Sequence, residues 1–177
     1  MLGVVLQIVF FLALIFVSLL VGGIISNRLP LTDPPGLGKR LSTYLSTHVA
    51  ETSADSEFPE LQLRHYHTPP ELLFDIARRA VNSLRWESAV LDPEKKEIQA
   101  VVTTKIWRFK DDVTIQIQPA SQGGSFLYVR SVSRVGRGDL GANTRHVMDL
   151  HIAVESILPP GALTPPKPPE ATSPTSE

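Results

Sequence analysis

The sequence contains no cysteine among its 177 residues. This absence excludes disulfide bonds, thiolate metal ligands, a cysteine nucleophile and a lipid-modified cysteine. An excess of charge of one sign is absent as well, because 17 basic residues stand against 18 acidic ones and the formal net charge is −1. A general basic surface is thereby excluded, and we expect no nucleic-acid partner.

Familiar catalytic motifs are also missing. The chain contains no G-x-S-x-G, no S-x-x-K and no Walker phosphate loop. His65 and His67 would share one face of a strand, but no third metal ligand is evident beside them. We therefore predict a protein that is not an enzyme, with no catalytic residues, no metal and no cofactor.

One long apolar run occupies the start of the chain. Between Leu2 and Ile25, 19 of 24 residues are apolar and none is charged. As a helix this run is about 36 Å long, enough to cross a hydrocarbon core of about 30 Å. A cleaved signal peptide has a basic first region and a shorter apolar core, and neither is found here. We predict a transmembrane anchor over residues 1–25, a single-pass protein of the cell membrane and the lipid bilayer as a partner.

The basic residues beside the run bear on its orientation. No Lys or Arg precedes it, whereas Arg28, Lys39 and Arg40 follow it. The positive-inside rule therefore favours the cytoplasmic side for the rest of the chain.

Residues 26–58 are predicted to be a connector with one short amphipathic helix. Three prolines end the anchor helix at the start of this segment. Beyond them, largely apolar side chains recur at helical spacing: Leu37, Leu41, Tyr44, Leu45, His48 and Val49. Lys39 and Arg40 fall outside this stripe. Two interpretations stay open, since such a helix either lies on lipid headgroups or packs on the domain that follows.

Residues 59–158 are predicted to form one α+β domain in the order strand, helix, four strands, helix. The expected strands cover about 61–67, 86–91, 97–107, 113–118 and 126–132, and the expected helices cover 70–84 and 142–158. Short turns between successive strands favour a five-stranded antiparallel sheet with both helices on one face. Val113, Ile115 and Ile117 alternate with polar residues, which is typical of a strand with one buried and one wet face. Residues 159–177 are rich in Pro, Ser and Thr and are predicted to be a disordered tail.

The segment from Arg130 to Arg145 is the most unusual part of the chain. Four arginines, one aspartate and three glycines lie there between a predicted strand and the last helix. One interpretation is an anion site, in which loop N–H groups and the arginines hold a phosphate or carboxylate. The other is structural: Asp139 caps the helix, and arginines pair with Asp111 and Asp112 across the sheet.

Two stretches of this region resemble a widespread bacterial and plastid family catalogued as domain of unknown function 1499. They read RFKDDVTIQI over residues 108–117 and VRSVSRVGRGDLGANTRHV over residues 129–147. The resemblance covers about residues 59–158. The family's motif positions fall on Asp111, Asp112, Arg130, Ser131, Ser133, Arg134, Gly136, Asp139, Leu140, Gly141 and Asn143.

The family has no established activity, so the resemblance implies an envelope-associated module and no catalytic role. Many relatives are exported, so the resemblance implies that the domain lies on the outer side of the membrane. The flanking charge favours the cytoplasmic side, and the side of the domain stays open. We predict a single-pass, non-enzymatic binding or scaffold module in the cell envelope or a membrane complex, with a membrane protein as its partner. The alternative is a binder of a small anionic or lipid ligand between the sheet and the last helix.

Overall fold

The computed structural model of the protein describes residues 2–104 and 108–162. Four α-helices, six strands and one short 3₁₀ helix lie within these residues. The helices are α1 (Leu2–Ser26), α2 (Leu37–Ser46), α3 (Pro70–Ser83) and α4 (Ala142–Ile157). The strands are β1 (Val49–Glu51), β2 (Arg64–Tyr66), β3 (Glu87–Asp92), β4 (Glu97–Thr103), β5 (Lys110–Pro119) and β6 (Ser125–Ser133), and the 3₁₀ helix η1 is Pro59–Leu61.

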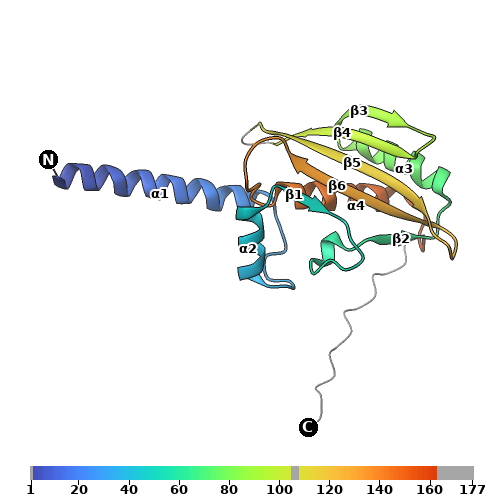
Figure 1. Ribbon diagram of the computed structural model, residues 1–177, viewed down its shortest axis with the longest axis horizontal. Helices are drawn as coiled ribbons and strands as arrows, with labels where there is room; N and C mark the ends of the chain where they lie inside the picture. Colours follow the sequence, from blue (N-terminus) through green and yellow to red (C-terminus); the bar gives the residue numbers. More distant parts are fainter. Residues whose placement is uncertain (1, 105–107, 163–177) are drawn as a thin grey trace, which may run out of the picture.

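The strands form one antiparallel sheet in the order β1-β6-β5-β4-β3, and β2 pairs with the other end of β6. Helices α3 and α4 contact each other and cover one face of this sheet (Figure 1). The predicted α+β class, with an antiparallel sheet and both helices on one face, is confirmed. The core between the layers is apolar, as the alternation in β5 predicts. Val113, Ile115 and Ile117 are buried there against Val147 and Leu150 of α4 and the other residues of one cluster.

The sheet has six strands rather than the predicted five. The additional strand is β1, which lies in the stretch where the sequence pattern predicts the end of a helix. Instead, α2 ends at Ser46, and residues 49–51 pair with residues 130–132 of β6. Residues 125–127 of the same strand pair with β2. The two short strands thus provide hydrogen-bond partners for backbone groups along an edge of β6 that would otherwise be unpaired. An unpaired edge is a site of unwanted association between chains, and these strands cover it.

Several element limits also differ from the sequence prediction. β2 covers three residues, and Pro59–Leu61 forms η1 instead of the strand start. β4 ends at Thr103, and residues 105–107 of the predicted strand lie outside the described residues. Most of the predicted tail also lies outside them, but Ala162 is described, and its carbonyl accepts a hydrogen bond of 2.7 Å from the His67 N–H. Leu72, predicted on the buried face of α3, is 51% exposed.

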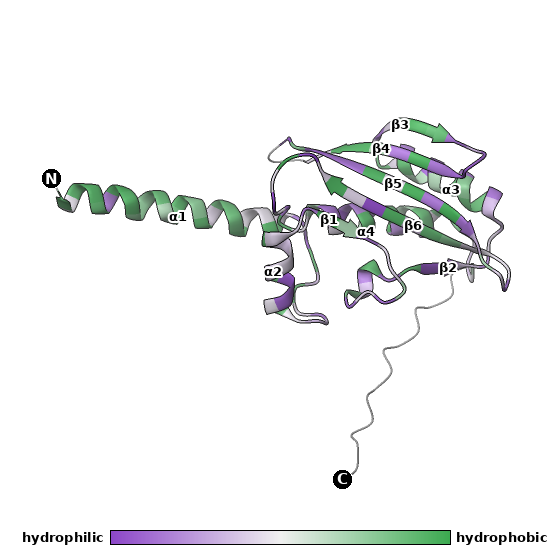
Figure 2. Ribbon diagram, viewed as in Figure 1, coloured by the Kyte–Doolittle hydropathy of each residue, from purple (hydrophilic) through white to green (hydrophobic). Residues whose placement is uncertain are grey.

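Helix α1 extends away from the domain (Figure 1) and is apolar along almost its whole length (Figure 2). Among the described residues it is the one helix long and apolar enough to cross a membrane. Its side chains are exposed except near its last turns, where Gly23 and Ile24 are buried. These two residues mark the place where the helix meets the domain.

Helix α2 packs on the domain, but through a face that the sequence pattern did not predict. Its buried residues are Arg40 and Tyr44, whereas Leu37 and Leu45 of the predicted stripe are 50% and 49% exposed. Arg40, expected off the buried face, is fully buried. The prediction for this side chain was wrong because a periodicity of apolar residues cannot detect a buried ion pair.

The Arg40 guanidinium is fully paired inside the domain. It donates to both carboxylate oxygens of Glu60 (Nη1–Oε1 2.5 Å, Nη2–Oε2 3.1 Å) and to the Tyr44 hydroxyl at 3.0 Å. It also donates to the main-chain carbonyls of Asp33 at 3.0 Å and Pro34 at 2.5 Å. These bonds join the segment before α2, α2 itself and η1 into one unit. The predicted connector is therefore tied to the domain over much of its length.

Candidate functional site

The candidate residues gather around one loop, residues 134–141, which we call the β6–α4 loop. It lies at the end of the sheet where α1 and α2 meet the domain (Figure 1). The sequence interpretations for this segment were an anion site and a structural arrangement in which Asp139 caps the last helix and arginines pair with Asp111 and Asp112.

Asn143, in the first turn of α4, joins three parts of the chain. Its Nδ2 donates to the His48 carbonyl and to the Ser133 hydroxyl, both at 2.9 Å. Its Oδ1 accepts a bond of 2.6 Å from the Ser131 hydroxyl. Asn143 and Ser131 are fully buried. A fully satisfied buried polar network of this kind fixes the geometry of the elements it connects, and here those elements are α4, β6 and the start of β1.

Asn143→Ala is expected to lower the free energy of unfolding by about 2 kcal/mol, because it leaves two buried or half-buried hydroxyls and a carbonyl without this partner. Urea unfolding of the full chain in detergent measures the change. Asn82→Ala is the matched control, since Asn82 is exposed near the end of α3. Equal stability of the two variants would show that the network contributes nothing.

Asp139 caps the last helix from just outside it. Its carboxylate accepts bonds from the N–H groups of Gly141 at 2.7 Å and Asn143 at 3.0 Å. Burial raises the pKa of the carboxyl, although these N–H groups favour its charged form. An anion at a helix N-terminus is stabilised by the unpaired N–H groups there. The protein's own carboxylate therefore takes the place that the anion-site interpretation gives to a ligand.

The backbone of the β6–α4 loop also holds residues 27–47, the segment between α1 and β1. The N–H of Leu140 donates to the Tyr44 carbonyl at 3.0 Å, and the N–H of Asp139 donates to the Thr47 carbonyl at 3.1 Å. The Leu140 carbonyl in turn accepts a bond of 2.9 Å from Asn27 Nδ2, just after α1. The loop thus contacts both the end of α1 and the end of α2.

Glycines make these close approaches feasible. A Cβ at Gly138 would lie 2.3 Å from the Leu45 carbonyl oxygen, and one at Gly141 would lie 2.1 Å from Leu29 Cδ1. Gly141 also has a φ of +81°, which L side chains rarely adopt. On the other side, a Cβ at Gly23 of α1 would lie 2.6 Å from Leu140 Cδ1.

The spacing of Gly136, Gly138 and Gly141 matches the dinucleotide fingerprint G-x-G-x-x-G, so the interpretation of this segment as lacking such a fingerprint was wrong. The context differs from that of a nucleotide-binding loop. The strand before it belongs to an antiparallel sheet, and the space at Gly138 and Gly141 is taken by Leu45 and Leu29 of the same chain. The glycines here make room for Leu29 and Leu45, which belong to the segment between α1 and β1.

Two of the motif arginines form ion pairs. Arg134 binds Asp112 through two nitrogens (Nε–Oδ2 2.9 Å, Nη2–Oδ1 2.7 Å), and Arg130 Nε lies 3.3 Å from Glu51 Oε2. The Arg134 guanidinium holds the pKa of Asp112 below its ordinary value. The expected pairing across the sheet is therefore present for Asp112.

Arg134→Ala is expected to leave the melting temperature of the full chain nearly unchanged. Both partners of the pair are about half exposed, with exposed side-chain fractions of 47% and 52%, and exposed ion pairs contribute little to stability. Thermal melting followed by circular dichroism checks this. A loss as large as that of Asn143→Ala would mean that the pair, rather than the buried network, holds the loop.

Asp111 lacks the arginine partner that the structural interpretation gives it. Its side chain is fully buried, and among the described residues its carboxylate oxygens have no hydrogen-bond partner of normal geometry. The nearest basic group is His146, with Nδ1 3.6 Å from Asp111 Oδ2. Burial raises the pKa of the carboxyl, and the Ser133 hydroxyl offsets only part of that rise. Adjacent residues of a strand point to opposite faces, so Asp112 meets solvent and Arg134 while Asp111 enters the core.

His146 is the residue of this cluster that the sequence interpretation missed. Its Nδ1 lies 3.3 Å from the Ser131 hydroxyl, and its ring contacts Trp86 edge to face at 6.0 Å. Burial lowers its pKa to about 4, so the ring is neutral at pH 7. The spacing could have found it, because residues 143 and 146 share a helix face.

One cluster has the three residue types of a hydrolytic triad: Ser131, His146 and Asp111. Its serine hydroxyl, however, is not accessible to a substrate. The Ser131 hydroxyl donates to Asn143 and is fully buried. A nucleophile has to reach its substrate through a cleft. The cluster therefore offers no argument for a serine hydrolase.

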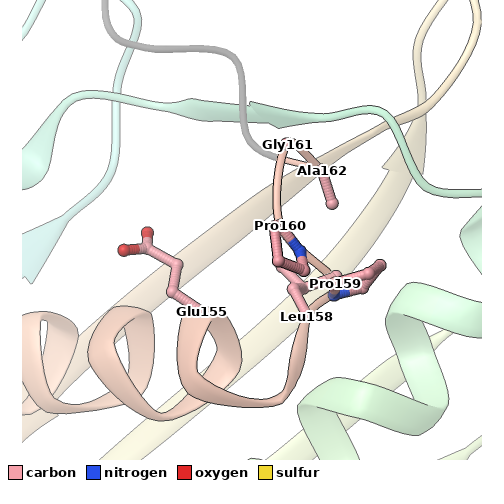
Figure 3. A pocket seen from close by; sticks show the side chains of 6 residues that line it. All are labelled: Glu155, Leu158, Pro159, Pro160, Gly161 and Ala162. Atoms are coloured by element: carbon pink, nitrogen blue, oxygen red, sulfur yellow. The ribbon is translucent and has the colours of Figure 1, made fainter.

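A hollow of about 290 Å³ lies elsewhere, at the end of α4 (Figure 3). It is lined by Glu155, Leu158, Pro159, Pro160, Gly161 and Ala162. None of the predicted site residues borders it. Within residues 2–104 and 108–162, no three His, Cys, Asp or Glu side chains gather in a way that could hold a metal ion.

Comparison with known proteins supports one statement about identity. A search of curated proteins found no match. A family model described as "Protein of unknown function (DUF1499)" matches residues 40–154. The match begins at Arg40 and includes β1 and the Asn143 network, so it extends into the predicted connector. Since the matched region is more than half of the chain, the protein belongs to the DUF1499 family.

Proposed function

We propose that this chain is a single-pass membrane protein whose DUF1499 domain is a non-enzymatic binding or scaffold module of the cell envelope, held in a fixed orientation at the bilayer. The observation that carries the proposal is the contact between α1 and the β6–α4 loop. α1 has 25 residues, about 37 Å at the rise of an α-helix, and is long enough to cross a bilayer.

The attachment supports a role in positioning. A flexible tether would let the domain move freely. Here, Gly23 packs against Leu140 and Asn27 bonds to the Leu140 carbonyl. Arg40 of α2 donates two hydrogen bonds to Glu60 of the domain and three more within residues 33–44. A domain joined in this way presents the same surface to the plane of the membrane at all times. This property suits a module that recognises a partner in or near the membrane.

The ligand-binding alternative gains no observation from the structure. The interface between the sheet and α4 is filled by side chains that are fully buried, among them Ile115, Val129, Leu150 and Val154. A ligand at this place would have to displace them.

Alkaline carbonate extraction of membranes tests the anchorage. The full chain should stay in the pellet, and Leu12→Arg with Phe16→Arg should release it, because charge in the middle of a span is costly. A soluble wild-type chain, or one shortened by cleavage after α1, would contradict the proposal. A reporter fused to the last residue determines the side of the membrane.

Crosslinking from intact membranes tests the module's role. We expect a reproducible membrane-protein partner to be captured by the wild-type chain and lost with Gly138→Ala, because a Cβ there would lie 2.3 Å from the Leu45 carbonyl oxygen and would loosen α2 from the β6–α4 loop. Repeated capture of no partner at all would count against a binding or scaffold role.

A further inference from the structure

We propose that one end of the domain rests on the anionic headgroup layer of the bilayer that holds α1. This end consists of α2 and residues 108–110 and 134–138, and we call it the proximal surface. The inference rests on the proposed membrane anchorage and adds a second contact, with lipid headgroups, that α1 alone does not provide.

The height of the proximal surface follows from α1. Arg28 is the first charged residue after the apolar run and has to lie outside the hydrocarbon core. Gly23 comes five residues earlier, about 8 Å along a helix axis. Leu140 contacts Gly23, so the β6–α4 loop lies near the boundary between hydrocarbon and headgroups.

Two neighbouring loop segments carry exposed apolar side chains there. The N–H of Arg134 donates to the Lys110 carbonyl at 3.1 Å, which extends the β5–β6 ladder by one pair beyond Asp111 and Ser133. The next residues outward are Phe109 and Val135, which are 47% and 64% exposed. Apolar side chains at a bilayer surface insert among the headgroups.

The two segments that carry these side chains are basic. Residues 108–110 and 134–138 contain four basic residues and no acidic one. Arg134 is paired with Asp112, which leaves Arg108, Lys110 and Arg137, all exposed. Clustered basic residues next to a transmembrane helix are attracted to anionic lipids. The near-zero charge of the whole chain conceals this local excess.

Helix α2 has the composition of an interfacial helix on its outer face. In the view of Figure 1 it runs across the direction of α1. Arg40 and Tyr44 face the domain, while Leu37 and Leu45 are half exposed, with the exposed Lys39 near them in sequence. An amphipathic helix with exposed leucines and lysine lies well in the headgroup region. In this proposal, α2 packs on the domain through one face and lies on lipid headgroups through the other.

The opposite end of the domain provides an internal control. β6 separates the two ends by about 27 Å, from Ser125 to Ser133. Leu72 lies in the first turn of α3, soon after β2, which pairs with the Ser125 end of β6. Its side chain is 51% exposed, close to the value for Val135.

Single-cysteine labelling tests the proposal directly, because the natural chain has no cysteine. An environment-sensitive fluorophore is placed on Val9→Cys in α1, on Val135→Cys or on Leu72→Cys in the full chain. Each variant is reconstituted in vesicles of phosphatidylcholine alone, or with a third of the lipid as phosphatidylglycerol. Quenching by lipids that carry a quencher at the headgroup or in the upper acyl chain reports contact.

The label at position 135 should be quenched as strongly as a fluorophore attached to a lipid headgroup. Its quenching should be stronger in vesicles that contain phosphatidylglycerol than in phosphatidylcholine alone. The label at position 72 should not be quenched. Lys110→Glu with Arg137→Glu should remove roughly half of the quenching at 135 by reversing two charges.

Quenching at position 9 but none at 135 would overturn the headgroup contact and leave the anchor standing. No quenching at position 9 would overturn the anchor itself. A label at 135 that is shielded only when membrane proteins are present would assign the surface to a protein partner and overturn the lipid proposal.

Discussion

Glu60→Gln is expected to lower the free energy of unfolding by about 3–5 kcal/mol, because removing one member of a buried ion pair leaves the other charge uncompensated. Arg40 and Glu60 have exposed side-chain fractions of 0% and 7%. The guanidinium would stay inside the domain without its counter-charge. Domains are stable by only about 5–15 kcal/mol, so urea unfolding of the full chain in detergent should show a large shift of the midpoint.

Two further variants test whether the loss of stability comes from the buried Arg40–Glu60 ion pair. Glu57→Gln removes the acid of an ion pair with Lys39 that is more than half exposed on both sides, and it should leave the midpoint nearly unchanged. Arg40→Met with Glu60→Leu removes both charges and should recover part of the stability lost by the single variant. A Glu60→Gln variant as stable as the wild type would contradict a stabilising role of the buried Arg40–Glu60 pair.

Mild acid is expected to destabilise the domain through two buried histidines. Burial lowers the pKa of His146 to about 4 and that of His151 to about 3. Both rings lie in α4, and neither ring nitrogen of His151 has a hydrogen-bond partner within the described residues. The unfolded chain takes up these protons near the ordinary histidine value of about 6.5, so stability is present above that pH and is lost as the pH falls toward the folded values. Between pH 7 and pH 5 each histidine should cost about 2 kcal/mol.

His151→Leu isolates one of these groups. This variant should lose about 2 kcal/mol less than the wild type between pH 7 and pH 5, whereas Ile152→Leu, at the exposed neighbouring position of α4, should behave as the wild type. Asp111 acts in the opposite direction, because burial raises its pKa and protonation relieves the buried charge. Single variants are therefore needed to read the histidine contribution. Equal acid sensitivity of His151→Leu and the wild type would contradict the account.

The parts of the fold that sequence could predict are those with long periodic patterns. The alternation in β5 and the helical spacing in α3 identify the buried faces because each pattern extends over several residues on one side of an element. Strand β1 is too short for this, since a three-residue strand has no period to detect. It forms because β6 offers it an edge, which is a property of the folded sheet.

The candidate site was predicted in its residues but only partly in its geometry. The motif from Arg130 to Asn143 does lie around one loop, and Asp139 does cap α4. The contacts of this loop with Leu29, Leu45 and Gly23 join segments about a hundred residues apart. No local pattern reports such contacts. The burial of Arg40 likewise depends on tertiary packing, as does the difference between the buried Asp111 and the exposed, arginine-paired Asp112.

The fixed attachment of the domain to α1 is the central claim. It is tested at Gly138, because the β6–α4 loop that contacts the end of α1 also packs on α2 at this residue. A Cβ there would lie 2.3 Å from the Leu45 carbonyl oxygen, which belongs to the backbone of α2 and cannot rotate away. Gly138→Ala should therefore loosen α2 from the loop while the core of the sheet stays intact.

A distance measurement between α1 and the domain tests this claim most directly. Spin labels on Val21→Cys in α1 and Ile152→Cys in α4 occupy exposed positions on the two parts. For the full chain in lipid nanodiscs, pulsed electron resonance should give one narrow distance distribution, which broadens in Gly138→Ala. A broad distribution for the wild-type chain, unchanged by that substitution, would show that the domain hangs on a flexible tether and would contradict the account.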